Sequence, residues 1–126
     1  MKTFSVSKIS SVVLHVKDTK VSAEFYGKVL GLKKTDEYDG MVWFLIGEGE
    51  NATPLMLHPS EKPNPVTAGL SVDFSVDDVD ALVSAVKSAG IGRVVQEPAD
   101  REWGVREAII EDPDGYQFWC NQPLNG

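Results

Sequence analysis

Residues 69–90, "GLSVDFSVDDVDALVSAVKSAG", contain a strand pattern followed at once by a helix pattern. Over 69–78 apolar and polar residues alternate, which is typical of a strand with one buried face. Over 78–90 the apolar residues recur at helical spacing. Asp78 is a suitable N-cap for this helix and Gly90 a suitable C-cap. The stretch therefore predicts a β-α unit.

The same order occurs earlier in the chain. Residues 9–18 alternate like a strand, and 19–30 carry a helical apolar stripe that Gly31 can end. Three strand-like runs follow each helix, at 32–38, 41–47 and 54–59 and again at 93–97, 105–111 and 116–122. We predict one α+β domain of two tandem β-α-β-β-β units. The units cover about residues 7–58 and 68–122, and a proline-rich linker covers about 59–67.

The alternation also predicts which way each strand faces. In the last strand, "YQFWCNQ" at 116–122, Phe118 and Cys120 share the side that packs against the helices. A tryptophan on the other side, where solvated residues are the default, indicates a sheltered surface. We therefore expect two curved mixed sheets that enclose a cup, with the helices on the outer face. The side chains of this strand on the cup side are Gln117, Trp119 and Asn121.

Composition limits the class of protein. The chain has 126 residues with 42% hydrophobic content, enough for one soluble domain. No apolar run has the ~20 residues of a membrane span, and the N-terminus does not have the pattern of a signal peptide, so a cytoplasmic location is expected. The net charge of −7 disfavours nucleic acid. It favours solubility, and it would also attract a cationic ligand.

Three motifs of the chain, together at their spacing, are characteristic of one known family. They are "FYGKVLGL" at 25–32, "VDFSVDDVDALV" at 72–83 and "EWGVREAIIEDPDG" at 102–115. In these motifs the chain is similar to the vicinal oxygen chelate superfamily, which includes glyoxalase I, extradiol dioxygenases and bleomycin resistance proteins. This resemblance covers nearly the whole chain and implies paired β-α-β-β-β units with concave sites, often in a homodimer.

The resemblance also implies where enzymes of the superfamily hold a metal ion. Each unit of such an enzyme gives one ligand from its first strand, usually His, and one from its last strand, usually Glu. None of the side chains at these positions here is a good ligand for a divalent cation. We therefore expect no metal and no cofactor, and the resemblance is to the metal-free, bleomycin-resistance-like branch. The four positions are Ser11, Met56, Ser71 and Trp119.

Other chemistry on the cup side is sparse. His15, His58 and Asp73 contain the donor types of a ferrous facial triad. Their spacing disfavours one, because His15 lies about 13 Å along its strand from the family's ligand position at ~3.3 Å per residue. Either Arg106 or Glu107 faces the cup, and Glu107 would there be an acid-base candidate.

The sequence favours a metal-independent small-molecule binding protein. It would sequester an aromatic, cationic ligand such as a bleomycin-like antibiotic, as a homodimer without nucleic acid or membrane partners. The alternatives are a lyase, isomerase or dioxygenase of the superfamily with a non-standard metal or acid-base site, and a module that binds a metabolite or protein. The candidate ligand-binding residues are Trp119, Trp103, Trp43, Met56, His15, His58, Ser11, Ser71, Asp73, Gln117, Asn121 and Glu107.

Overall fold

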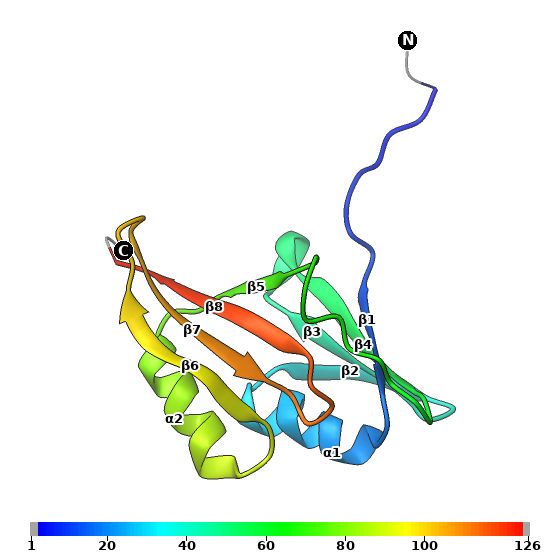
Figure 1. Ribbon diagram of the computed structural model, residues 1–126. Coiled ribbons are helices and arrows are strands. Elements are labelled where there is room, and N and C mark those ends of the chain that lie inside the picture. Colours follow the sequence, from blue (N-terminus) through cyan, green and yellow to red (C-terminus); the bar gives the residue numbers. More distant parts are fainter. Residues whose placement is uncertain (1–2, 125–126) are drawn as a thin grey trace.

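The computed structural model describes residues 3–124 and contains two β-α-β-β-β units (Figure 1). The predicted α+β fold is therefore confirmed. No helix within residues 3–124 is long and apolar enough to cross a membrane. The first unit consists of β1 (Val12–Val16), α1 (Thr19–Glu24) with a π-helical turn (Phe25–Val29), β2 (Lys33–Tyr38), β3 (Met41–Ile46) and β4 (Thr53–Pro59). The second consists of β5 (Val72–Ser75), α2 (Val79–Ala89), β6 (Arg93–Asp100), β7 (Val105–Glu111) and β8 (Gln117–Pro123).

The strands form two separate four-stranded sheets. Sheet A has the order β1-β4-β3-β2, and sheet B has the equivalent order β5-β8-β7-β6. In each sheet the first strand is parallel to the last, and the other pairs are antiparallel. The edge strands β1 and β5 belong to different sheets and are not paired with each other. Each therefore has one edge without a ladder.

Both caps predicted for α2 are present in the structure. The Asp78 carboxylate accepts a hydrogen bond from the Ala81 N–H at 3.0 Å, and Gly90 has the left-handed φ of 71° that a helix C-cap needs. The first helix differs, because the predicted helix at 19–30 changes to a π-helical turn at Phe25. The Leu30 N–H bonds the Phe25 carbonyl oxygen at 3.0 Å and closes this wider turn.

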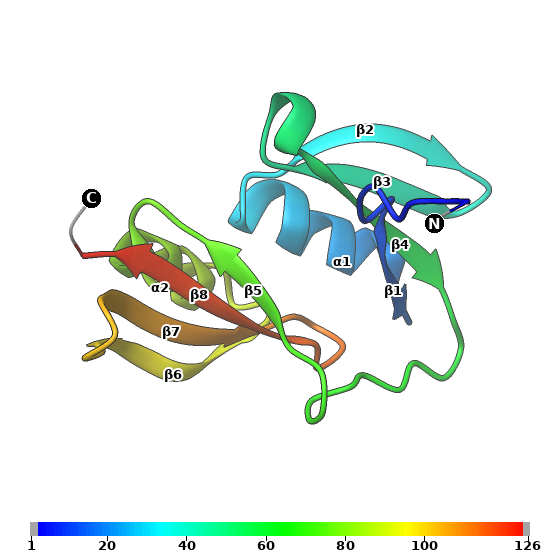
Figure 2. The ribbon, with the colours of Figure 1, turned by 90° about the horizontal axis from the view of Figure 1, so that it is seen from above.

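The helix of the first unit contacts both sheets (Figure 2). Consecutive residues of a helix point about 100° apart, so one sheet can rarely bury both. Here Phe25 and Tyr26 are both fully buried. The Tyr26 ring centroid lies 6.5 Å from that of Phe44 in sheet A and 6.1 Å from that of Phe118 in sheet B. One continuous apolar core therefore joins the two units.

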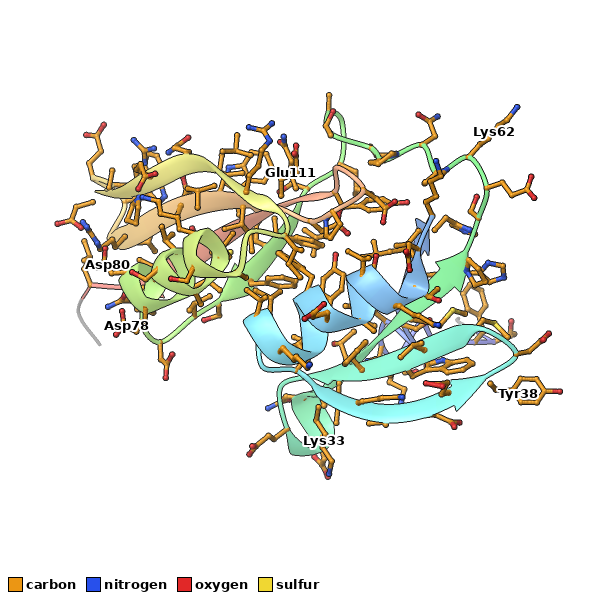
Figure 3. The ribbon with its side chains drawn as sticks, turned by 90° about the horizontal axis from the view of Figure 1, so that it is seen from below. Lys33, Tyr38, Lys62, Asp78, Asp80 and Glu111 are labelled. Atoms are coloured by element: carbon orange, nitrogen blue, oxygen red, sulfur yellow. The ribbon has the colours of Figure 1, made fainter. Side chains whose placement is uncertain are left out.

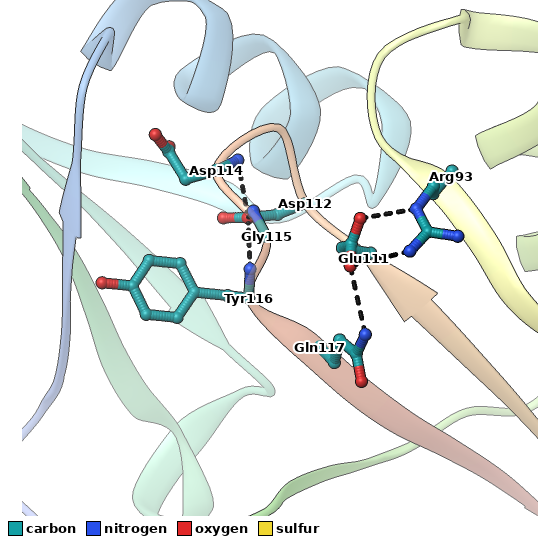
Figure 4. Close-up of polar contacts among 7 residues, drawn as sticks. All are labelled: Arg93, Glu111, Asp112, Asp114, Gly115, Tyr116 and Gln117. Atoms are coloured by element: carbon teal, nitrogen blue, oxygen red, sulfur yellow. Dashed lines mark hydrogen bonds and ion pairs between the residues drawn. The ribbon is translucent and has the colours of Figure 1, made fainter. Parts of the chain in front are cut away.

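The turn at residues 112–116 connects the two units through polar contacts beside the buried Tyr26. Asp112 is only 2% exposed. One of its carboxylate oxygens accepts the N–H groups of Asp114, Gly115 and Tyr116 at 2.9 Å each (Figure 4). The other accepts the hydroxyl of Tyr26 at 2.7 Å. Burial raises the pKa of Asp112, although these hydrogen bonds oppose the rise.

The same turn covers the free edge of β1. Tyr116 accepts a hydrogen bond from the His15 N–H at 3.2 Å and donates its hydroxyl to the His15 carbonyl oxygen at 2.9 Å. Asp114 accepts from the Lys17 N–H at 3.0 Å and from the Ser22 hydroxyl at 3.2 Å. The "DPDG" motif thus satisfies part of an exposed strand edge and fixes the second unit against the first.

Candidate functional site

The face of sheet B that points away from the helices is called here the open face of sheet B. It has Trp119 near its centre, and Trp119 is half-buried, whereas Phe118 and Cys120 on the other face are buried. The ladder places Asp73 on one side of Trp119 and Ile109 on the other. The row across the four strands is Asp73, Trp119, Ile109 and Gln96.

The next row along the open face of sheet B is more polar. Asn121 lies opposite Ser75 on one side and Glu107 on the other. The Glu107 side chain is only 13% exposed and its carboxylate lies 3.6 Å from the Nε of Arg101. Glu107 therefore faces the predicted cup side. Its neighbour Arg106 lies on the other face, where its guanidinium donates to Asp80 and Asp100 at 2.9–3.0 Å.

Three buried polar atoms among the described residues have no hydrogen-bond partner. They are the Nε2 of Gln96, the Nε of Arg101 and the Oδ1 of Asn121. The strand register places Gln96 and Asn121 on the open face of sheet B. Arg101 follows β6, and its Nε lies 3.6 Å from the carboxylate of Glu107. A buried unsatisfied polar group costs about 1–3 kcal/mol. Gln96 and Asn121 therefore give the face one donor and one acceptor that the chain itself does not use, whereas the Arg101 Nε already forms an ion pair with Glu107.

The sequence did not indicate Gln96 or Arg101. The ladder between β6 and β7 is irregular on both sides of Gln96. A bulge inserts residues and changes which side chains share a face, so simple alternation fails along β6. A polar residue in the middle of "RVVQEP" was the available signal, but the pattern did not fix its direction.

At the other end of the open face of sheet B, the side chains form hydrogen bonds with one another (Figure 4). Gln117 donates its amide to Glu111 at 3.1 Å, and Arg93 donates to the same carboxylate at 2.6 and 3.2 Å. Burial opposes ionisation of Glu111, but these hydrogen bonds outweigh it and hold its pKa below the usual value. Ser71 donates its hydroxyl to Asp73. Gln117 and Ser71 thus use hydrogen bonds within the chain.

The corresponding open face of sheet A carries the first-unit candidates. Met56 lies opposite Val13 and Trp43 in the ladder. His15 and His58 are paired across β1 and β4, with ring centroids 5.1 Å apart, and the Nδ1 of His58 lies 3.0 Å from the Pro59 carbonyl oxygen. These four candidates come together: Trp43, Met56, His15 and His58.

The remaining candidates lie elsewhere. Trp103 is 67% exposed in the turn between β6 and β7, and Ser11 is exposed before β1 begins. The candidates thus form two groups on two sheets. Figure 3 shows the side chains along both sheets, with the first helix between them. Within one chain the two open faces belong to separate sheets.

The metal site of the enzymes does not fit these residues. The four equivalent positions carry two hydroxyls, a thioether and an indole, whereas a divalent cation prefers imidazole, carboxylate or thiolate. Within residues 3–124, no group of three or more His, Cys, Asp or Glu side chains is placed to hold a metal ion. We therefore derive no chemical step through a metal at this position.

A cavity lies at a different place in the described part of the chain. It has a volume of about 560 Å³ and lies between the units, beside the helix-facing side of β5. None of Trp119, Trp43, Trp103 or the two histidines lines it. Its apolar wall includes Leu30, Leu32, Ile46, Phe74, Val76 and Leu82. None of the candidate ligand-binding residues therefore lines this cavity.

Comparison with known proteins agrees with the fold. The chain is 32% identical to a lactoylglutathione lyase of Haemophilus influenzae, over 88% of this chain and 89% of that protein. It is 32% identical to a probable lactoylglutathione lyase of Vibrio cholerae, over 88% and 87%.

Solved structures of other proteins share the fold of this chain. TnmS3, an antibiotic binding protein from Streptomyces sp. CB03234, is 25% identical with a TM-score of 0.70 over 95% of this chain and 98% of that one. The fosfomycin resistance protein FosX of Listeria monocytogenes shares the fold, with a TM-score of 0.78 at 18% identity over 94% of each chain. Residues 8–120 match the pattern of one family. The chain belongs to the Glyoxalase/Bleomycin resistance protein/Dioxygenase superfamily.

Proposed function

We propose that the protein sequesters an aromatic small molecule on the open face of sheet B, stacked on Trp119, without a metal ion. This proposal rests on one observation, the position of Trp119 and the polar side chains next to it. The indole takes the position of a ligand carboxylate in the enzymes, and the Oδ1 of the adjacent Asn121 is buried without a partner. An aromatic wall with a few directed polar groups is typical of a small-molecule site.

The chemistry of the face limits the ligand. The unpartnered donor on Gln96 suits a carbonyl or ether oxygen, and the unpartnered acceptor on Asn121 suits an amine or hydroxyl. Asp73 beside Trp119 and the net charge of −7 favour a cationic group on the ligand. A bleomycin-like antibiotic combines these features, and the antibiotic binding protein TnmS3 is a relative of similar size.

A homodimer would complete the site. The first helix and its core contacts occupy the space between the two sheets of one chain. Pairing the open face of sheet A with the open face of sheet B therefore requires a second copy. Such a dimer would form two equivalent cups, each with Trp43, Met56 and His15 from one chain and Trp119 and Asn121 from the other.

Tryptophan fluorescence tests the proposal. Bleomycin and a panel of planar cationic and neutral aromatic compounds would be titrated into the wild-type protein, Trp119→Ala and Trp103→Ala. We expect a panel member to quench the wild type and Trp103→Ala alike and to bind Trp119→Ala at least tenfold more weakly, because stacking contributes about 0.5–1.5 kcal/mol beyond the area buried. Equal affinities for all three proteins would contradict the proposal.

A second function is favoured by one observation, the 32% identity to a lactoylglutathione lyase. The alternative site would use Glu107 as the acid-base residue, with Arg101 beside it at 3.6 Å. Formation of lactoylglutathione would be measured with the protein as purified and after addition of Ni²⁺ or Zn²⁺. We expect no turnover in either case. Turnover that Glu107→Gln abolishes and Trp119→Ala does not would favour the lyase.

A further inference from the structure

The two histidines of the sequence, His15 and His58, lie side by side. His15 belongs to β1 and His58 to β4, and the parallel ladder of these strands places them directly opposite each other. Their ring centroids are 5.1 Å apart, and the ring planes make an angle of 46°. Residues opposite each other in a ladder point to the same side, so both imidazoles belong to the open face of sheet A.

A hydrogen bond sets the orientation and the tautomer of one ring. The Nδ1 of His58 lies 3.0 Å from the carbonyl oxygen of Pro59. A carbonyl oxygen only accepts, so Nδ1 carries the hydrogen and the lone pair of the neutral ring is on Nε2. Histidine ligands of metal ions have this same arrangement, in which one ring nitrogen donates to a backbone carbonyl and the other binds the ion.

The separation of the rings fits one coordination geometry. With a Zn–N bond of about 2.0–2.1 Å, the centroid of a bound imidazole lies about 3.2 Å from the ion. Two imidazoles on one ion then have centroids about 5.2 Å apart at a tetrahedral angle and about 4.5 Å apart at a right angle. The observed 5.1 Å agrees with the tetrahedral value. The pair therefore suits Zn²⁺ better than Cu²⁺, which favours tetragonal sites.

The pair is also accessible to an ion. His15 is exposed and His58 is half-buried. Within residues 3–124 no third His, Cys, Asp or Glu side chain joins them in a metal-binding group. Two of four tetrahedral positions would therefore be left for water or for a donor atom of a bound molecule. The net charge of −7 favours a cation at the surface. Neither histidine occupies any of the four positions of the superfamily's metal site.

We propose that His15 and His58 form a two-imidazole site for one Zn²⁺ ion on the open face of sheet A. The ion bridges the edge strand β1 to β4 and keeps two exchangeable coordination positions. This site goes beyond the proposed function, because it lies on the other sheet from Trp119 and does not depend on the aromatic ligand.

Equilibrium dialysis of the full chain against Zn²⁺ tests the site. The variants are His15→Gln, His58→Gln and the two together, and Glu50→Gln is the matched control, since Glu50 is an exposed carboxylate of the same unit in the turn before β4. We expect wild type and Glu50→Gln to bind one Zn²⁺ per chain and all three histidine variants to bind at least tenfold more weakly. Each single variant should lose as much affinity as the double variant, because one imidazole cannot chelate. Equal affinity of wild type and double variant, or one ion shared by two chains, would overturn the proposal.

Thermal unfolding gives a second readout of the same site. An ion that bridges β1 and β4 only in the folded chain should raise the Tm of the wild type by about 5 °C at ten times the zinc dissociation constant. The double variant should show no rise at that concentration. A rise of equal size in both proteins would assign the zinc to other groups and reject the histidine site.

Proton NMR of the wild type requires no variant. The sequence has two histidines, so two sets of imidazole signals are expected. Both sets should change together during addition of Zn²⁺ and reach their end point at one equivalent. A change confined to one ring, or no change in either, would show that the two imidazoles do not share an ion.

Discussion

Removal of one hydroxyl tests the connection between the two units. Tyr26→Phe keeps the buried ring and its contacts with Phe44 and Phe118 but deletes the 2.7 Å hydrogen bond to Asp112. A hydrogen bond to a charged group contributes about 1.5–3 kcal/mol, so we expect a loss of about 2 kcal/mol at pH 7. For a chain of this size that corresponds to a fall in Tm of about 6–10 °C.

The loss should depend on pH with a defined sign. The Tyr26 hydroxyl stabilises the ionised form of Asp112 and so lowers its pKa, although burial keeps the pKa above the usual value of 3.8. The contribution of this hydrogen bond is therefore present where Asp112 is ionised and is lost as the pH falls through its pKa. The difference in stability between wild type and Tyr26→Phe should shrink as the pH falls from 7 toward about 4.

Urea unfolding followed by circular dichroism measures both effects. Tyr38→Phe, whose ring is 69% exposed, is the matched control and should unfold within about 0.5 kcal/mol of the wild type. A Tyr26→Phe loss as small as that of the control, or a loss of equal size at pH 7 and pH 4, would refute the role assigned to the 112–116 turn.

Two further predictions concern a crowded glycine and the buried cysteine. Gly92→Ala should destabilise the protein far more than Gly31→Ala in thermal unfolding, because a Cβ at Gly92 would lie 2.6 Å from the Glu111 carbonyl oxygen and from the Phe25 ring, whereas Gly31 has a similar positive φ and open space. Equal losses would indicate that backbone strain alone matters there. Burial, with Asp73 adding to it, raises the pKa of the Cys120 thiol to about 12, so an aromatic disulfide reagent should label it only after denaturation. Fast stoichiometric labelling in native buffer would contradict this burial.

The order of apolar and polar side chains was sufficient to predict the fold, because strand alternation and helix spacing follow from local backbone geometry. The alternation around Val72 and Phe118 predicts their helix-facing side, and Asp78 and Gly90 mark the ends of α2. The two-unit order follows from repetition of the same pattern along the chain.

The site was less predictable because it depends on contacts distant in sequence. The bulges around Gln96 change the face that β6 presents, and alternation cannot register them. Trp103, a candidate ligand-binding residue, lies 67% exposed in the turn between β6 and β7, and the strand pattern does not fix the direction of a turn residue. Ser11 lies outside β1, whose ladder with β4 begins at Val12 opposite Leu55.

The hydrogen bond between Tyr26 and Asp112 spans 86 positions of the chain. During synthesis the first unit leaves the ribosome long before residue 112 exists. Until then Phe25 and Tyr26 have only sheet A to cover them, and the edge of β1 is open. The first unit therefore acquires its final surface only when the last strands arrive. Mutations in the 112–116 turn should consequently reduce the yield of folded protein in cells, through capture or aggregation of the waiting first unit, even where they leave β8 itself intact.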